Sequence, residues 1–221
     1  SLNFDGAKSD HVKRFFIENA LYWLEDFHID AFRLDATHEL YDFSAVPFLE
    51  ELTAEIHAWA EKNNKQVYAI AENDRSDRRL TLPRSVNGAG LDGQWLDDLH
   101  HTLHVALTSE DDGYYADYTD YALLLKVLRE GFSYSGQYSP GWDRKHGTSS
   151  ADLSTERFIV CTQNHDQVGN RMLGERLSAL TDFDGLKLVA GLLLTSPYVP
   201  LLFMGQEYAE TAPFLYFISH G

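Results

Sequence analysis

The stretch DAFRLDATHEL, residues 30–40, sets an arginine and an aspartate inside a short apolar run. Because side chains alternate along a strand, Arg33 and Asp35 share one face, while Phe32 and Leu34 take the other. Burying such a charged pair costs free energy, so the pair is either a structural ion pair or part of a functional site. The stretch therefore predicts a buried strand that ends at a charged pair.

Strands and helices alternate outward from this stretch. Hydrophobic residues at three- and four-residue spacing predict helices at 9–27, 47–63, 118–130 and 184–194. Short apolar runs predict further strands at 66–71, 91–95, 157–163 and 198–204. A short helical turn is expected after residue 95, and residues 131–155 are typical of a polar loop. The alternation indicates an α/β fold with a parallel sheet, and the continuous apolar character of the strands predicts cover on both faces.

Two of the predicted helices carry specific expectations. The helix at 9–27 is expected to be capped by Ser9. Its buried stripe is expected to comprise Val12, Phe15, Phe16, Ala20, Trp23, Leu24 and Phe27. The apolar residues of the helix at 184–194 are expected to lie in the core. The chain shows no internal repeat and no linker, so residues 1–221 are expected to form part of one domain.

Composition limits the class of partner. The chain has 221 residues, of which 34 are acidic and 18 basic, giving a formal charge of −16. This charge repels phosphate backbones and anionic lipid, so neither nucleic acid nor a membrane is an expected partner. No apolar stretch approaches the roughly 18 residues of a membrane span. The single cysteine, Cys161, leaves no internal disulfide and favours a cytoplasmic location.

Acidic residues follow several of the predicted strands. Asp35, Glu72 and Asp166 each come at or just after the end of one, and in a parallel barrel all such ends open on one face. Three converging carboxylates can divide the work of breaking a glycosidic bond. Asp35, held ionised by its neighbouring arginine, suits the nucleophile; Glu72, after an apolar run, suits the general acid. Asp166, with His165, suits the stabiliser of positive charge.

Each of these interpretations has a structural alternative. The Arg33–Asp35 pair taken alone can be a satisfied ion pair without function. The Asn-His-Asp sequence at 164–166 can be a loop in which the asparagine and aspartate serve only as caps. Coincidence of acids at three separate strand ends favours the catalytic interpretation.

Three motifs occur in order along the chain: DAFRLDATH, AIAEND and CTQNHDQVGN. They resemble the second, third and fourth sequence motifs of the α-amylase family, whose catalytic domain is a (β/α)8 TIM barrel that works by a retaining mechanism. The resemblance implies that Asp35 is the nucleophile, Glu72 the acid/base and Asp166 the transition-state stabiliser. It implies that Arg33 and His165 are their partners in the active site, and it implies no cofactor.

The resemblance also implies which part of a barrel is present. The residues correspond to about strands 4–8 with the preceding helix, a partial barrel. The family's first motif, the first barrel strands and an N-terminal domain are not among residues 1–221. The isolated fragment is therefore expected to be inactive, with unpaired sheet edges.

Longer stretches narrow the expectation within the family. LDATHEL, NHDQVGNRMLGERLS, DGQWLDDLHHTLHVALT and GQEYAETAPFLYFISHG look most like members that act on maltooligosyltrehalose, cleaving the α-1,4 bond next to its trehalose end. The expected substrate is thus maltooligosyltrehalose or a related α-glucan, and the expected product is trehalose. A glycogen branching enzyme, an α-amylase, or a non-catalytic family member that acts as a binding module remain alternatives.

Several further residues have two interpretations each. His38 and Glu39 follow the nucleophile and can bind the reducing-side sugars or form a polar turn. Trp95 can stack on a sugar ring or pack in the core. The sequence HHTLH sets His100 and His104 four residues apart, with His101 beside them, a spacing that can bind zinc, although packing or hydrogen bonding is favoured and no metal is expected. The tyrosines at 114, 115 and 118 can line the mouth of the site or pack in the core.

Overall fold

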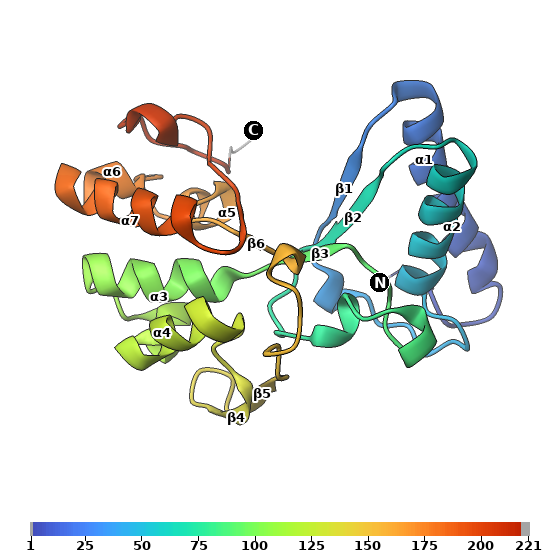
Figure 1. The fold of residues 1–221 in the computed structure, drawn as a ribbon, viewed down its shortest axis with the longest axis horizontal. Helices are drawn as coiled ribbons and strands as arrows, with labels where there is room; N and C mark the ends of the chain where they lie inside the picture. Colours follow the sequence, from blue (N-terminus) through green and yellow to red (C-terminus); the bar gives the residue numbers. More distant parts are fainter. Residues whose placement is uncertain (1, 218–221) are drawn as a thin grey trace. The chain divides into compact units, whose positions relative to one another are not determined.

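The chain divides into two units, Ser1–Trp95 and Leu96–Gly221, and the computed structural model describes residues 2–217 of them (Figure 1). In the first unit the elements are α1 (Ser9–Phe27), β1 (Ala31–Leu34), η1 (Thr37–Glu39), α2 (Phe48–Lys62), β2 (Tyr68–Ala71), η2 (Arg78–Leu80), η3 (Arg84–Val86) and β3 (Gly93–Trp95). β1 pairs with β2 and β2 with β3, both in parallel. α1 and α2 lie side by side against these strands. The predicted parallel sheet with helical crossovers is thus confirmed in this unit.

The core of the first unit lies between the two helices and the strands. Leu24 of α1, Ile56 of α2 and Ala69 of β2 are fully buried there. Aliphatic residues of both helices meet the apolar face of the sheet, which is the usual way for a helix layer to cover a sheet.

The predicted buried stripe of α1 is partly wrong. Ala20 and Leu24 are buried as expected, but Ile17 belongs to the same face, and Trp23 and Phe27 are 41% and 52% exposed. The two rings pack on each other at the surface, with centroids 4.5 Å apart. Ser9 is the first helical residue, and the cap position is Lys8. The prediction followed the aromatic residues, whereas the helix buries its aliphatic face.

The strand that carries Arg33 is less buried than predicted. Ala31 and Arg33 are exposed, and Phe32 and Leu34 are only partly buried. β1 lies at one end of the strand order among residues 2–217. The alternation of the two faces is confirmed, but the predicted cover on both faces is wrong for this strand, since one face of β1 is exposed and the other only partly buried.

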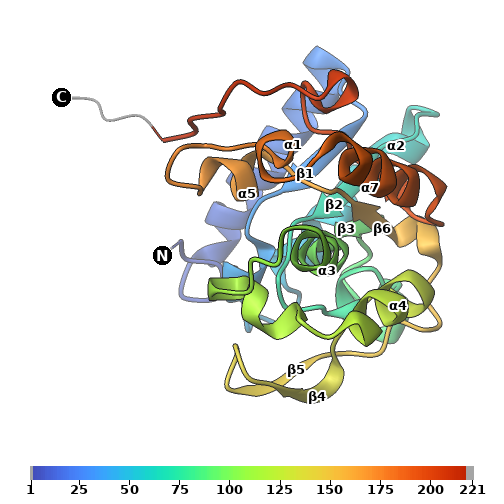
Figure 2. The same ribbon diagram turned by 90° about the vertical axis from the view of Figure 1, so that its left-hand side faces the viewer.

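In the second unit helices outnumber strands. Its elements are α3 (Asp97–Thr108), η4 (Gly113–Tyr118), α4 (Tyr121–Glu130), β4 (Ser135–Ser139), β5 (Arg144–Gly147), η5 (Thr155–Arg157), β6 (Phe158–Val160), α5 (His165–Gly169), α6 (Leu177–Leu180), α7 (Phe183–Thr195), β7 (Val199–Pro200) and η6 (Gln206–Tyr208). β6 and β7 pair in parallel. Figure 2 looks along α3 and shows α4 and α7 running past it.

Three expectations for the second unit need correction. The segment 131–155 contains the antiparallel hairpin β4–β5, which polar, solvent-facing side chains concealed in the sequence. A full helix, α3, replaces the short helical turn expected after residue 95. α7 is not wholly core, since Leu188 and Leu194 are 62% and 59% exposed.

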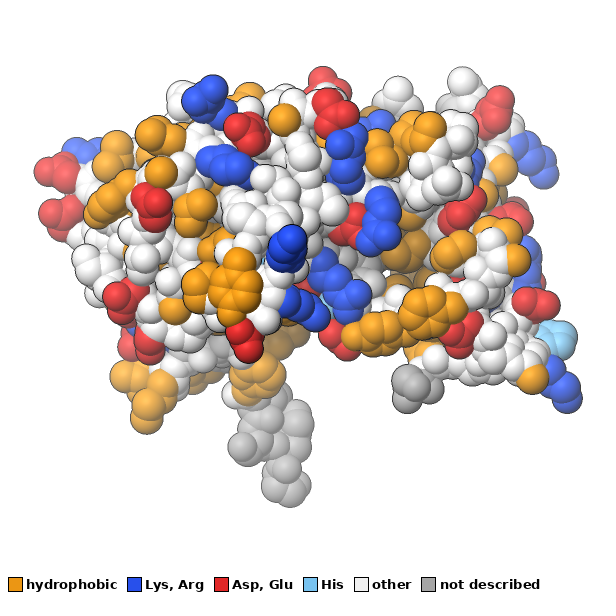
Figure 3. Space-filling view, turned by 90° about the horizontal axis from the view of Figure 1, so that it is seen from below, with side chains coloured by type: hydrophobic (Ala, Val, Ile, Leu, Met, Phe, Trp, Pro, Cys, Tyr) orange, Lys and Arg blue, Asp and Glu red, His pale blue; other side chains and the backbone are white. Residues whose placement is uncertain are grey.

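Apolar side chains lie between acidic and basic ones on the face drawn in Figure 3. Within residues 2–217, no helix is both long and apolar enough to cross a bilayer.

Candidate active site

Strand β1 delivers Arg33 and Asp35 to the same end of the sheet. Nη1 of Arg33 donates a 2.6 Å hydrogen bond to Oδ1 of Asp35. The guanidinium carbon lies 4.2 Å from the ring centre of Trp95, which is 8% exposed. A cation held over an indole face is attracted by the ring quadrupole, so Trp95 supports the arginine while the arginine orients the carboxylate. The Asp35 side chain itself is 77% exposed.

Glu72 lies at the matching end of the neighbouring strand. Leu34 of β1 and Ala71 of β2 are register partners, so Asp35 and Glu72 occupy the next positions along two parallel strands. The backbone N–H of Ala36 donates a 2.5 Å hydrogen bond to Oε2 of Glu72. The Glu72 N–H donates to the Leu34 carbonyl at 2.8 Å. The segments that carry the two carboxylates are therefore joined by both backbone and side-chain hydrogen bonds.

A left-handed residue makes this arrangement possible. Ala36 has φ 45° and ψ 46°, a conformation in which a residue with a Cβ atom is strained by roughly 1–2 kcal/mol. The turn that it forms aims its N–H at Glu72. Thr37, next along, is 4% exposed and donates its hydroxyl to the Glu72 carbonyl at 2.7 Å, while accepting from Asn73 Nδ2 at 3.2 Å. Buried, fully paired groups therefore fix the backbone under Glu72.

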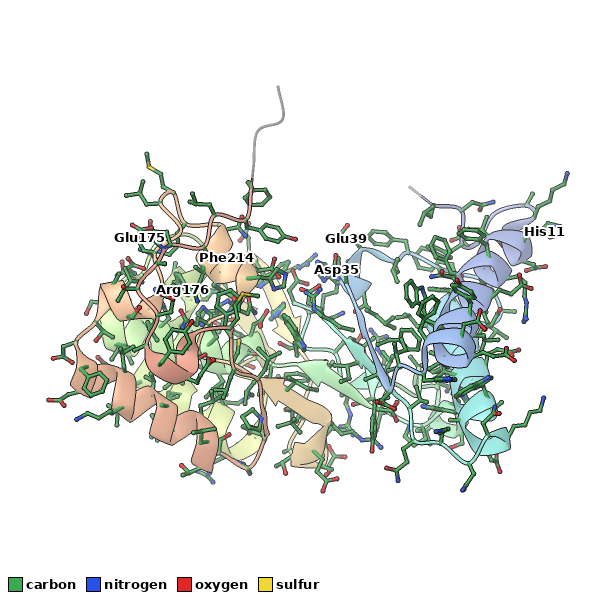
Figure 4. The ribbon with its side chains drawn as sticks, turned by 90° about the horizontal axis from the view of Figure 1, so that it is seen from above. His11, Asp35, Glu39, Glu175, Arg176 and Phe214 are labelled. Atoms are coloured by element: carbon green, nitrogen blue, oxygen red, sulfur yellow. The ribbon has the colours of Figure 1, made fainter. Side chains whose placement is uncertain are left out.

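His38 and Glu39 lie in the 3₁₀ turn that follows. Nδ1 of His38 is 3.4 Å from the Asp74 carboxylate, and its Nε2 is 3.9 Å from that of Glu39. Figure 4 shows Asp35 and Glu39 close together at the end of β1. The predicted contact of His38 and Glu39 with the reducing-side sugars stays a prediction, and the structure places both residues in a polar turn after Asp35.

In the second unit, Asp166 stands in the first turn of α5. Oδ1 of Asn164 accepts from the N–H of Asp166 at 2.8 Å, so the asparagine is the N-cap of this short helix. The capping role that the sequence analysis gave Asn164 as an alternative is therefore present. Nε2 of His165 lies 3.2 Å from Oδ1 of Asp166. The Asp166 carboxylate is 41% exposed.

Close packing holds the C-terminal segment around Tyr216 against α5. A Cβ atom on Gly169 would lie 2.4 Å from Cβ of Tyr216, so only glycine allows this approach. The Tyr216 ring is 5.4 Å from that of His165. The guanidinium of Arg176 donates to the carbonyls of Ala212 and Met204 at 2.7 and 2.8 Å. Figure 4 shows Arg176 near Phe214 in this part of the chain.

Two of the three histidines of α3 have hydrogen-bonding partners in the protein, whereas Nδ1 of the third, His101, is buried without one among the described residues. His100 bonds Thr162 and Tyr115, and His104 bonds Glu110. No set of three or more His, Cys, Asp or Glu side chains in the described residues has the arrangement of a metal site. Of the tyrosines predicted to line the site or to pack in the core, Tyr115 is 7% exposed and packs against His104, whereas Tyr114 is 53% exposed.

The structure groups the predicted residues within each unit. Arg33, Asp35, Glu72 and Trp95 come together in the first, with His38 and Glu39 beside them, and His165 and Asp166 come together in the second. Sequence reasoning missed the contributions of Ala36, Thr37 and Asn73. A backbone N–H in a left-handed turn leaves no signal in residue type.

Comparison with solved structures gives the class of protein. A Salmonella typhimurium protein assigned as an alpha amylase matches 96% of this chain with a TM-score of 0.88 and 37% sequence identity, over 37% of its own length. The α/β fold described above is therefore part of a barrel of the α-amylase type, as the sequence motifs predicted.

Sequence comparison narrows the class further. The malto-oligosyltrehalose trehalohydrolase of Rhizobium sp. (strain M-11) is 45% identical over 100% of this chain, and that of Saccharolobus solfataricus is 45% identical over 98%. The chain is a homologue of the malto-oligosyltrehalose trehalohydrolases, and it spans 37% and 38% of the lengths of these two. A 1,4-alpha-glucan branching enzyme of Bacillus caldolyticus is more distant, at 29% identity. No protein-family model matches the chain.

Proposed function

We propose that the intact protein is a retaining glycoside hydrolase that cleaves the α-1,4-glucosidic bond next to the trehalose end of maltooligosyltrehalose. The observation that carries the proposal is that Asp35 and Glu72 follow register partners at the ends of two paired parallel strands. Two carboxyl groups on neighbouring strand ends suit a double displacement, in which they stand roughly 5–5.5 Å apart. The names of the relatives support the choice of substrate.

The reaction proceeds in two steps. The Asp35 carboxylate attacks the anomeric carbon, while Glu72 donates a proton to the glycosidic oxygen and trehalose leaves. Glu72, now a carboxylate, then takes a proton from water, whose oxygen attacks the anomeric carbon and releases Asp35 with a shortened maltooligosaccharide. Asp166 stabilises the positive charge that develops on the sugar in both steps.

The remaining predicted residues bind sugar. Arg33 and His165 contact the reacting unit, and His38 and Glu39 contact the trehalose side. Trp95, which is only 8% exposed, contributes through its support of Arg33. Both units belong to one catalytic barrel domain in this proposal. Related α-glucans are included among the proposed substrates. The buried thiol of Cys161 is compatible with a cytoplasmic location.

Substitution of the nucleophile tests the proposal. Asp35→Asn in the intact protein is expected to lower kcat by at least about 10³-fold, because an amide cannot form the covalent intermediate. Asp26→Asn, at an exposed position of α1, is the matched control and is expected to leave kcat unchanged. Hydrolysis is measured on purified maltooligosyltrehalose. Unchanged activity of Asp35→Asn contradicts the assignment of this residue as the nucleophile, whereas absence of hydrolysis by the unaltered intact protein favours a binding module.

Product analysis separates the alternatives of the same family. Free trehalose supports the proposed reaction. Maltose and glucose without trehalose indicate an α-amylase, and branched glucan indicates a branching enzyme.

A further inference from the structure

A chain of contacts runs through the second unit from α3 to the segment that carries Asp166. It consists of His100, Tyr115, His104, Glu110 and Arg171, and we call it the α3 network. His100, His104 and Tyr115 are 1%, 5% and 7% exposed. Polar groups that are buried to this extent cost stability unless all of them are paired, so a paired set holds its members in one geometry.

The first end of the network fixes Thr162, the second residue after the end of β6. Nδ1 of His100 lies 2.7 Å from the Thr162 carbonyl oxygen. A carbonyl only accepts, so Nδ1 carries the proton, and Nε2 accepts from the Tyr115 hydroxyl at 2.9 Å. Burial, and next the neighbouring His104, lower the pKa of His100 to about 3, in keeping with a neutral ring.

The middle of the network is an aromatic stack. The rings of Tyr115 and His104 lie 4.2 Å apart and within 11° of parallel. Nε2 of His104 is 2.7 Å from Oε2 of Glu110. The stack therefore links the neutral hydrogen bonds at one end to an ionised group at the other.

The second end is a two-pronged ion pair. Nη1 and Nη2 of Arg171 donate to the two carboxylate oxygens of Glu110 at 2.7 and 2.9 Å. A bidentate pair of this kind fixes orientation as well as distance. Hydrogen bonding to Arg171 holds the pKa of Glu110 at about 2, so the carboxylate is ionised at neutral pH.

The two ends lie on either side of Asp166. Thr162 comes four residues before it and Arg171 five residues after it. Between them, Asn164 caps the turn and the N–H of Asn170 donates to the Asp166 carbonyl at 2.9 Å. The network thus holds both flanks of the one short segment that bears the proposed stabilising carboxylate.

We propose that Tyr115 and Glu110 are positioning residues, which act through Thr162 and Arg171 to set the direction of the Asp166 carboxylate during hydrolysis. The inference rests on the proposed function of Asp166. It gives the histidine spacing of α3 a role other than metal binding.

Two substitutions test the inference in the intact protein, each with a matched control. Tyr115→Phe removes the hydroxyl that donates to His100 and keeps the stack. Tyr198→Phe is its control, because Tyr198 is also buried and its hydroxyl donates to the Val127 carbonyl, outside the network. Glu110→Gln removes the charge from the pair; Glu130→Gln, paired with Lys126 on α4, is its control. Misplacing a reacting group by about 1 Å costs on the order of 100-fold in rate, so each test variant is expected to lose about 10- to 100-fold in kcat. KM is expected to stay within about twofold, because substrate contacts are unchanged.

The readouts separate positioning from simple stability. kcat is expressed per folded molecule, and melting midpoints of test and control variants are compared. A kcat for Tyr115→Phe and Glu110→Gln equal to that of their controls overturns the inference. If Glu110→Gln does not fold, Tyr115→Phe decides alone. Asp166→Asn is measured in parallel: if it keeps full activity, the proposed function of Asp166 fails, whereas its inactivity together with normal test variants means that only the positioning inference fails.

Discussion

A single buried lysine shows how residue chemistry shapes the surroundings of the site. The side chain of Lys13 is 2% exposed, and its Nζ lies 3.0 Å from the Asp42 carboxylate. It also donates to Ser44 Oγ and to the Val46 carbonyl, both at 2.6 Å. These contacts tie α1 to the loop that follows the Asp35 strand.

Removal of this lysine is expected to destabilise the protein strongly. Lys13→Met leaves Asp42, with a 5% exposed side chain, as an uncompensated charge, and breaking such a pair costs roughly 3–5 kcal/mol. The free energy of unfolding is measured by urea denaturation. Lys62→Met, at an exposed position of α2, is the control. A loss equal to that of the control contradicts the role given to the lysine.

Glu110 gives a pH prediction with a definite sign. Its pKa is lowered from 4.5 to about 2, chiefly by the hydrogen bond from Arg171, so the pair stabilises the fold above pH 4.5. That contribution is lost as pH falls toward 2. The difference in free energy of unfolding between the parent protein and Glu110→Gln is therefore expected to shrink between about pH 5 and pH 2. A constant difference over this range contradicts the assignment.

At the same scale, the sequence predicted the charged atoms of the site better than their supports. The Arg33–Asp35 bond was expected because side chains two apart share a strand face, and it is confirmed. The indole under Arg33 was not predicted, since it comes from a strand about 60 residues away. Contacts between distant segments depend on the register of strand pairing, which cannot be derived from a single sequence.

A side-chain cap stabilises the start of α7 in the second unit. Oδ1 of Asp182 accepts from the N–H of Gly185 at 2.8 Å at the start of α7. Asp182→Ala is expected to cost about 1 kcal/mol of stability through loss of this cap. Asp184→Ala removes only an 87% exposed partner of Lys187 and is expected to change stability by under about 0.5 kcal/mol. Equal effects in thermal unfolding contradict the capping role.

Periodicity located most elements and misjudged some faces. Helices α1, α2, α4 and α7 lie within a few residues of their predicted bounds, because three- and four-residue spacing persists over several turns. The strands are shorter than predicted, since an apolar run continues past the last ladder hydrogen bond. The β4–β5 hairpin was missed because RKHG and SGQYS lack an apolar face.

For the whole molecule, exposed apolar surface predicts how the 221-residue chain behaves alone. Phe15, Trp23 and Phe27 of α1 and Leu188 of α7 are between 41% and 67% exposed. Apolar patches of this kind bind hydrophobic dyes and favour association. The chain expressed alone is expected to bind anilinonaphthalene sulfonate, to self-associate in light scattering and to release no trehalose.

A triple variant provides the control for that prediction. Replacing Phe15, Trp23 and Phe27 by serine is expected to lower dye fluorescence, because the rings belong to the exposed side of α1. Trehalose release by the 221-residue chain, or dye binding no stronger than that of a well-folded globular protein, contradicts the expectation.

The left-handed backbone at Ala36 limits which residues can occupy the position next to Asp35. Glycine there removes the steric strain and asparagine tolerates it, whereas valine and isoleucine meet a prohibitive clash with their own backbone. Glycine and asparagine are therefore the favoured replacements and β-branched residues the disfavoured ones, although the methyl group of Ala36 takes no part in the chemistry. In a randomised library at codon 36, selected for growth on the substrate, valine and isoleucine are expected to be absent, because the positive φ angle of this one residue excludes them.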